Sequence, residues 1–238
     1  MIKKVFIFVM IVMMVLTTAP VGAENSEFSD IRGHWAEAFI EKWTKKGIIS
    51  GFTDGTFRPD DMITRAEVAK ILTLAFDLES KPDTLDEFYD LDSSAWYYPY
   101  LECAARYIPK YPLVDSKPSM EPYWNAGHGF LPNEDAIRMH VAETLVEIKM
   151  EKENLEIEIP NIYDIQAELI KDTQEPSYMS IFVTPQGSIP ENMRRMFKYT
   201  WLAKELDVME GDENGYFLPY NYISRAGFVT MIDRLLPE

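Results

Sequence analysis

The chain has 238 residues, with 39 acidic side chains and 23 lysines and arginines, so its net charge at pH 7 is −16. Because phosphate and anionic lipid binding depend on clusters of lysine and arginine, this charge argues against nucleic acid and lipid headgroups as partners. The single cysteine, Cys103, excludes an intrachain disulfide, and we expect it to pack as a small apolar residue.

The first 23 residues have the pattern of a secretion signal. Lys3 and Lys4 precede an apolar run at residues 6–16, and small residues at 21–23 precede a cleavage site before Glu24. The alternative is an uncleaved membrane anchor. A helix that spans a bilayer needs about 20 apolar residues, however, and this run is shorter. Cleavage removes two lysines and leaves a net charge of −18. We therefore predict a secreted protein with no membrane span after signal cleavage.

A helix is predicted next, because Ala36, Phe39, Ile40 and Trp43 recur at helical spacing. Gly47 is placed to end this helix, with two lysines in its last turn.

A glycine-containing loop follows at residues 51–61. We expect Gly51 and Gly55 to adopt backbone angles closed to other residues, and Pro59 to stiffen the exit. A second helix is predicted from Thr64, because Thr64 and Glu67 form the pattern of a capping box. Its expected buried face consists of Val68, Ile71, Leu72 and Ala75.

This loop and helix start recur later in the chain. Residues 51–67 align without a gap with residues 211–227, and a weaker copy lies between them at a shift of 73. The matches in the last copy are Gly211, Gly215, Phe217, Pro219, Ile223, Arg225 and Ala226, and those in the middle copy are Phe130, Pro132, Arg138 and Ala142. Self-similarity of this kind indicates a repeat protein, in which several helix–loop–helix units share one core.

The two later repeats are divergent. Repeat one covers residues 28–78, and repeat two covers 88–150 with an inserted loop at about 109–129, after an expected helix that contains Cys103. Repeat two matches Phe28, Asp30 and Trp35 of repeat one with Phe88, Asp90 and Trp96. It lacks the capping pair, because Ile137 and His140 stand in place of Thr64 and Glu67. Repeat three covers residues 162–236 and is expected to open at 162–165.

Repeat three also carries an insertion, at about residues 166–190, where we expect a surface loop that can include a short helix. Its two main helices are predicted at residues 193–209 and from Ser224, which can still cap although Gly227 removes the glutamate. The predicted fold class is therefore all-α.

The pattern resembles the S-layer homology family. That family's repeat has an F-x-D turn, then HWA, GI-x-G, DGTFRPD and ITRAE, and repeat one matches all five, at residues 28–31, 34–36, 47–51, 54–60 and 63–67. The resemblance implies three repeats packed about a pseudo-threefold axis with a central helical bundle. It also implies non-covalent attachment to the bacterial cell wall through secondary cell-wall polysaccharide, often pyruvylated, bound in grooves between repeats.

The resemblance assigns ligand binding to the arginine of the TRAE motif, which is Arg65 here and corresponds to Arg138 and Arg225. Independently, an arginine in the first turn of a helix is suited to an anion, and carboxylates and an indole suit a sugar. The predicted polysaccharide-binding residues are Arg65, Trp35, Asp54, Gly55, Asp60, Thr64, Arg138 and Arg225. Two structural alternatives stay open: Arg65 could pair with Asp60 or Asp61, and Trp35 could belong to the core.

Other functions have weaker support. The three histidines form no metal-ligand spacing and no nucleophile motif occurs, so we expect no enzyme and no cofactor. Residues 210–215 mimic part of a calcium loop, but Asn221 stands where a bidentate glutamate is required. The main alternative is a divergent scaffold that binds another envelope protein through its inserted loops, with Tyr111, Tyr123 and Trp124 as aromatic anchors.

Overall fold

The computed structural model describes residues 28–81, 85–86, 88–114, 117–118, 128–169, 191–211 and 217–236. The predicted secretion signal lies outside these residues. Within them, no helix has both the length and the apolar character needed to cross a membrane.

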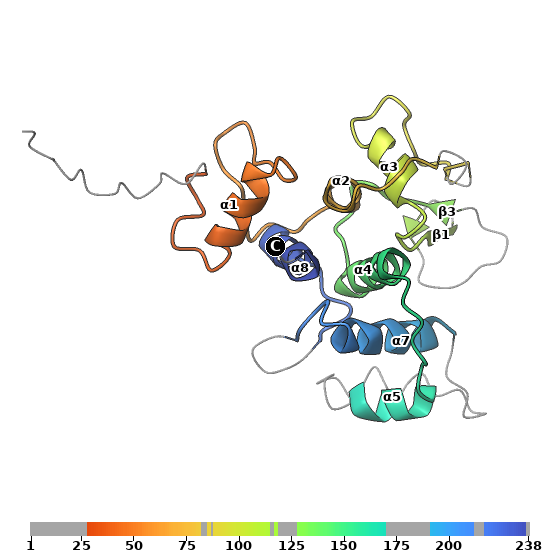
Figure 1. Ribbon diagram of the computed structural model, residues 1–238. Helices are drawn as coiled ribbons and strands as arrows, with labels where there is room; N and C mark the ends of the chain where they lie inside the picture. Colours follow the sequence, from red (N-terminus) through yellow and green to blue (C-terminus); the bar gives the residue numbers. More distant parts are fainter. Residues whose placement is uncertain are drawn as a thin grey trace, which may run out of the picture.

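Three inner helices lie side by side in the middle of the molecule: α2 (Arg65–Phe76), α4 (Arg138–Glu153) and α8 (Arg225–Leu235) (Figure 1). Each is covered by one outer helix. Helix α3 (Tyr98–Ala104) packs on α2, α7 (Glu191–Glu205) on α4, and α1 (Glu37–Lys45) on α8. The prediction of an all-α fold is confirmed.

Each inner helix is covered by the outer helix of the next repeat rather than of its own. At the α1–α8 contact, Trp43 donates its indole N–H to Asp233 at 2.9 Å, and Lys42 pairs with the same carboxylate at 2.7 Å. At the α3–α2 contact, the Thr73 hydroxyl lies 3.1 Å from the carbonyl of Tyr100. Each of the three repeats covers the inner helix of its neighbour in this way. The repeats therefore share one core, and no helix pair can bury its faces alone.

The core is apolar and closely packed. Its buried side chains include Ile31, Ile40, Trp43, Leu72, Leu101, Leu145, Phe197, Leu202 and Ile232. Cys103 is buried as a free thiol, as predicted from its place in an apolar helix. Desolvation by this burial raises the pKa of the Cys103 thiol, which keeps it protonated and unreactive at neutral pH.

The insertions add two small elements. In repeat two, β1 (Tyr111–Val114) pairs antiparallel with β2 (Lys117–Pro118) and β3 (His128–Gly129), in the order β2-β1-β3. The sequence predicted only a loop there. In repeat three, α5 (Ile162–Leu169) packs on α7, and Ile165 is buried against Met193, Met196 and Phe197. The segment at which repeat three was expected to open, residues 162–165, is therefore the start of a helix. The remainder of that insertion lies outside the described residues.

The helix ends follow the predicted chemistry. Thr64 caps α2 in a full capping box, in which Glu67 accepts hydrogen bonds from the backbone N–H and hydroxyl of Thr64, both at 2.9 Å. Ser224 caps α8 by accepting the N–H of Gly227 at 3.1 Å, whereas Ile137 gives α4 no side-chain cap. Each of these three results was predicted from the sequence.

The glycines of the first loop act differently from one another. Gly55 has a φ of 80°, which only glycine adopts at little cost, as predicted. The prediction for Gly51 was wrong in its reason, because Gly51 does not have a positive φ. A Cβ at Gly51 would instead lie 2.2 Å from a ring carbon of Phe28, so glycine is required there by close packing.

Candidate functional site

The starts of the three inner helices meet in a closed ring of backbone hydrogen bonds. The N–H of Ile63 donates to the carbonyl of Ile223 at 3.0 Å, that of Ile223 to Ala136 at 3.0 Å, and that of Ala136 to Ile63 at 2.8 Å. The ring relates the three helix starts by an approximate threefold operation. It therefore places Arg65, Arg138 and Arg225, two residues further along, at equivalent positions.

Each of these arginines reaches into the loop of the next repeat. Arg65 donates from Nε to the carbonyl of Phe130 at 2.6 Å and from Nη2 to that of Pro109 at 2.7 Å. Arg138 makes the matching bonds to Phe217 at 2.9 Å and Glu210 at 3.0 Å.

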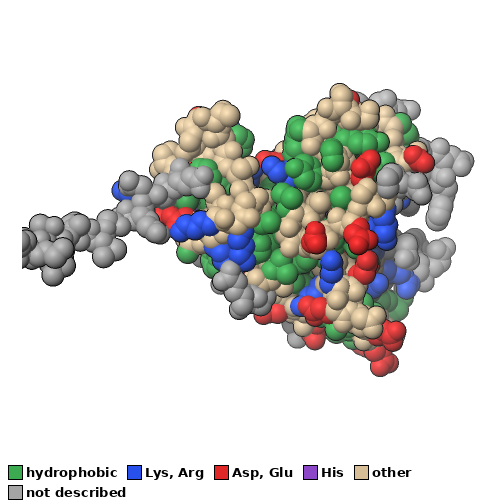
Figure 2. Space-filling view, turned by 45° about the horizontal axis from the view of Figure 1, so that its top comes forward, with side chains coloured by type: hydrophobic (Ala, Val, Ile, Leu, Met, Phe, Trp, Pro, Cys, Tyr) green, Lys and Arg blue, Asp and Glu red, His purple; other side chains and the backbone are tan. Residues whose placement is uncertain are grey.

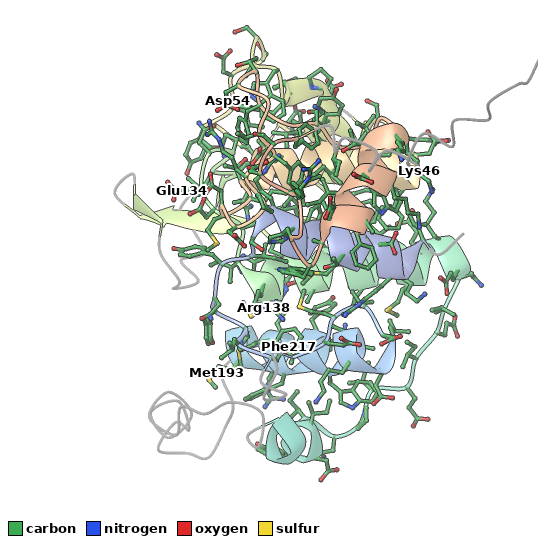
Figure 3. All side chains as sticks on the ribbon, turned by 90° about the vertical axis from the view of Figure 1, so that its left-hand side faces the viewer. Lys46, Asp54, Glu134, Arg138, Met193 and Phe217 are labelled. Atoms are coloured by element: carbon green, nitrogen blue, oxygen red, sulfur yellow. The ribbon has the colours of Figure 1, made fainter. Side chains whose placement is uncertain are left out.

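Arg225 completes the set by donating to the carbonyls of Phe57 at 2.9 Å and Ser50 at 3.1 Å. Each guanidinium also lies over the ring of the phenylalanine that it bonds, at 4.9 Å for Arg65, 5.5 Å for Arg138 and 4.6 Å for Arg225. Figure 3 shows Arg138 beside Phe217. The three arginines therefore join neighbouring repeats through backbone acceptors and aromatic faces.

Burial separates Arg65 and Arg225 from an exposed anion site, whereas Arg138 is only partly buried. Arg65 is 2% exposed, and Arg225 is also buried. A guanidinium already bonded to carbonyls inside the fold has fewer donors to offer a ligand, so the most direct role of Arg65 is to hold repeat one against repeat two.

The three sites differ in the side chain at the glutamate position of the TRAE motif. Arg225 pairs with Glu67 at 2.5 Å, and Glu67 also caps its own helix. The equivalent position is His140 opposite Arg65, and Gly227 opposite Arg138. Only the contact between repeats three and one therefore keeps the arginine–glutamate pair.

His140 gives this region a measurable pH response. Burial, and then the positive charges of Arg65 and Arg195, lower the pKa of His140 from its ordinary 6.5 to about 3. The folded state thus holds His140 neutral while the unfolded chain takes up a proton below about pH 6.5. The stability contributed by the neutral ring is complete above that pH and is lost as the pH falls toward 3.

We expect His140→Gln to remove this dependence. Urea denaturation of both proteins at pH 7.5, 6.5, 5.5 and 4.5 should show the parent losing more stability than the variant as the pH falls. Carboxylates that titrate in both proteins affect the two free energies of unfolding equally, so they cancel in the difference between parent and variant. Parallel curves would contradict a neutral His140 in the folded state.

The first loop forms an exposed polar cluster. Asp54 accepts from the backbone N–H of Thr56 at 3.1 Å, from its hydroxyl at 2.6 Å and from Arg58 at 2.8 Å. These bonds, led by the Thr56 hydroxyl and Arg58, lower the pKa of Asp54 from 3.8 to about 2. Arg58 also lies 4.0 Å from the ring centre of Phe52, with Arg225 at 4.9 Å from the same ring. A ligand at this loop would meet a cation, an aromatic ring and a carboxylate together.

Trp35 lies on the surface, so the alternative that it belongs to the core was wrong. Its side chain is 63% exposed, whereas Trp43 two turns later is 3% exposed. The indole packs against His34 with ring centres 5.3 Å apart, and His34 contacts Asp60 at 3.3 Å. His34 also accepts the N–H of Ala36 at 3.1 Å, which fixes its ring. Trp35 and Asp60 thus belong to one exposed corner of repeat one.

The remaining predicted residues have structural contacts. Gly55 accepts the N–H of Ser29 through its carbonyl at 3.0 Å, and Thr64 is the α2 cap. Asp54 lies near one end of the inner helices, the end from which Arg138 and Glu134 also project, while Lys46 lies toward the other (Figure 3). Phe52 and Arg58 of the loop cluster were not predicted as site residues, although both stand next to residues of the loop that the sequence marked.

Most of the repeat-two insertion and of the calcium-like segment lies beyond what the structure describes. Only the backbone of Tyr111 is described, and Tyr123, Trp124 and residues 212–215 lie outside the described residues. Across the described ranges, no group of three histidine, cysteine or acidic side chains is arranged to hold a metal ion.

Comparison with known proteins points to bacterial surfaces. Residues 27–69 match the family model of the S-layer homology domain. The chain is 38% identical over 80 residues to "Cell surface glycoprotein 1" of Acetivibrio thermocellus, covering 34% of this chain and 4% of that protein. It is 36% identical over 74 residues to the "Cellulosome-anchoring protein" of the same organism, covering 31% and 17%.

A longer match, 30% identical over 151 residues, is to an "S-layer protein" of Bacillus thuringiensis subsp. finitimus and covers 61% of this chain and 16% of that protein. The chain thus spans only a small part of each of these three relatives, at most 17%.

Proposed function

We propose that this chain, in which residues 27–69 are an S-layer homology domain, is a secreted protein of the bacterial cell surface that attaches non-covalently to the wall. Its ligand is secondary cell-wall polysaccharide, and it performs no catalysis. The relatives support this location, because their names are those of surface-layer, cell-surface and anchoring proteins.

The observation that carries the proposal is the exposed corner of repeat one. An indole that is 63% exposed offers a flat apolar face to the C–H side of a pyranose ring. The neighbouring His34 and Asp60 offer hydrogen-bond groups for sugar hydroxyls. The His34 ring is fixed within this corner, because its two nitrogens contact Asp60 and accept the N–H of Ala36. A rigid site loses less entropy on binding than a mobile one.

Charge shapes how binding occurs. After signal cleavage the net charge of −18 (21 basic and 39 acidic side chains) repels an acidic glycan at long range, but screening over about 8 to 10 Å at ordinary salt confines the repulsion. Arg58, half-exposed on the first loop beside Phe52, supplies a local cation for an acidic substituent such as a pyruvyl ketal. We therefore expect binding that is slow to form and tolerant of salt, rather than accelerated by electrostatic attraction.

Sedimentation with purified cell-wall sacculi tests the proposal. Mature protein is mixed with intact sacculi or with sacculi stripped of secondary polysaccharide, and the pelleted fraction is measured. We expect the parent to pellet only with intact sacculi, and Trp35→Ala to lower its apparent affinity about tenfold, the loss of one good stacking contact.

Tyr163→Ala is the matched control. Tyr163 is an exposed aromatic residue on α5, away from repeat one in the sequence, and its removal should leave pelleting unchanged. Equal pelleting with stripped sacculi would overturn the polysaccharide as ligand. Capture of envelope proteins by the same bait, with no binding to either kind of sacculi, would favour the inserted loops as a protein-binding surface instead.

A further inference from the structure

Residues 155–160 connect α4 to α5 as an extended segment that belongs to no helix or strand (Figure 1). We propose that this segment is a docking edge for an extended stretch of a partner protein that carries lysine or arginine at every second position. The mode of binding is β-augmentation, in which a peptide adds a strand to an exposed backbone edge. This inference goes beyond the proposed function, because it concerns a protein partner and a part of the chain that the glycan site does not use.

The side chains of the segment alternate between two environments. Every second one is half-buried, namely Leu155, Ile157 and Ile159, and those between them are exposed. Ile157 and Ile159 pack against the main core, and Ile159 also packs against the smaller cluster under α5. A period of two is that of a β-strand with one face on a core and the other in water. The segment therefore has the side-chain pattern of a strand and is held in place by its own aliphatic residues.

The backbone of the segment has the free groups of an edge strand. The N–H of Leu155 donates to the carbonyl of Met150 at 2.9 Å, at the end of α4. Beyond it, the N–H groups of residues 156–159 and the carbonyls of 155–160 have no protein partner among the residues that the structure describes. A row of unpaired N–H and C=O groups at the surface is a template for pairing with another extended chain.

Charge selects the kind of chain that fits this edge. Glu156 and Glu158 occupy exposed positions between the aliphatic residues, and Asp164 is exposed shortly after them. Figure 2 shows acidic side chains gathered toward the lower right of the molecule, the side on which Figure 1 draws α4 and α5. A strand with lysine or arginine opposite the two glutamates gains cross-strand ion pairs, whereas acidic residues at those places are repelled.

The same charges argue against a second copy of this chain as the occupant. If two segments pair antiparallel about Ile157, Glu156 of each copy lies opposite Glu158 of the other. If they pair about Glu158, the two copies of that residue face each other. Like charges directly opposite each other destabilise a strand pair, and a one-residue slip would turn the aliphatic side chains away from the core. Charged residues on an exposed edge are a common means by which proteins prevent self-association.

A synthetic peptide tests the pairing. The probe has about eight residues, an ordinary strand length, with lysine and valine in strict alternation and both ends blocked. One comparison peptide alternates glutamate and valine, and another has the probe's lysines and valines in two separate blocks. The mature chain is titrated with each peptide, and the hydrogen exchange of its backbone amides is followed by NMR.

We expect the alternating lysine peptide to slow the exchange of two alternate amides in the segment, either those of residues 156 and 158 or those of 157 and 159. The reason is that successive N–H groups of an extended chain point to opposite sides, so a partner strand covers every second one. A peptide held by charge alone leaves these amides open to water. Equal slowing of all four amides, or of none, would overturn the docking edge.

Charge reversal provides the matched variants. Glu156→Lys combined with Glu158→Lys should weaken binding of the lysine peptide at least about tenfold and should favour the glutamate peptide instead. The control combines Glu79→Lys with Asp86→Lys, which makes the same change of net charge at two exposed carboxylates between α2 and α3. It should bind the lysine peptide as tightly as the parent. Unchanged thermal midpoints establish that both variants are folded, as expected for exposed side chains.

Two further results would contradict the proposal. If the control variant weakens binding as much as the charge reversal, the peptide is attracted by the net charge of the protein rather than by this segment. If the parent forms a dimer in which residues 156–159 are protected without any peptide, the occupant is a second copy of the chain. Neither result bears on the wall-binding experiment, which uses sacculi and no peptide.

Discussion

Arg65→Ala is expected to lower the free energy of unfolding by about 3 to 5 kcal/mol, more than any exposed substitution in the first repeat. The side chain is 2% exposed and fills space between α2 and the second loop. Its removal leaves a cavity and deprives the carbonyls of Phe130 and Pro109 of charged donors. It also removes the guanidinium from the face of Phe130, where it lies 4.9 Å from the ring centre.

Urea denaturation followed by circular dichroism measures this change. Arg58→Ala is the control, because Arg58 is an arginine of the same repeat that lies on the surface. Arg65→Lys should fall between the parent and Arg65→Ala, since a lysine keeps the charge but cannot present the two-pronged geometry. If Arg65→Ala and Arg58→Ala denature at the same urea concentration, the arginine does not hold the repeats together.

This expectation affects how wall-binding experiments are designed. A variant that loosens the contact between repeats one and two loses wall binding whether or not Arg65 touches the glycan. Exposed residues such as Trp35 separate the two effects, because their removal leaves the core intact. A binding role for Arg65 would require a folded variant, and Arg65→Lys is the best candidate for one.

The helices and their caps could be predicted because their causes are local. An apolar stripe through Ala36, Ile40 and Trp43, and a capping pair three residues apart, act within a few turns of one chain segment. The exposure of Trp35 had no such local signal. Trp35 stands four residues before Phe39, a member of the same stripe, so helical spacing alone did not place its side chain on the solvent side.

The role of the three arginines in joining the repeats could not be predicted from local sequence. Arg65 bonds to carbonyls 44 and 65 positions away, and a backbone carbonyl carries no side-chain signature. The repeat marked Arg65, Arg138 and Arg225 as equivalent, but not that each would enter the next repeat. For the same reason the pairing of Glu67 with Arg225, 158 positions away, had no signal apart from the closed arrangement of the three repeats.

Gly51→Ala is the second large effect, and we expect it to cost about 3 kcal/mol. The added Cβ would lie 2.2 Å from Phe28 and 2.4 Å from the carbonyl oxygen of Thr56. Neither neighbour can move easily. Phe28 is buried against Phe57, and the Thr56 carbonyl accepts the N–H of Phe52 at 2.7 Å, which closes the loop.

Gly55 provides the comparison that identifies the cause. It has a φ of 80°, and no atom lies within 4 Å of the place that a Cβ would occupy, so a substitution there meets backbone strain and no collision. Asparagine tolerates that backbone region better than alanine, so Gly55→Asn should cost less than Gly55→Ala. At Gly51 the order reverses, because the larger side chain collides more. Thermal denaturation of the four variants would show this reversal if packing governs Gly51, and the same order at both positions if backbone angle does.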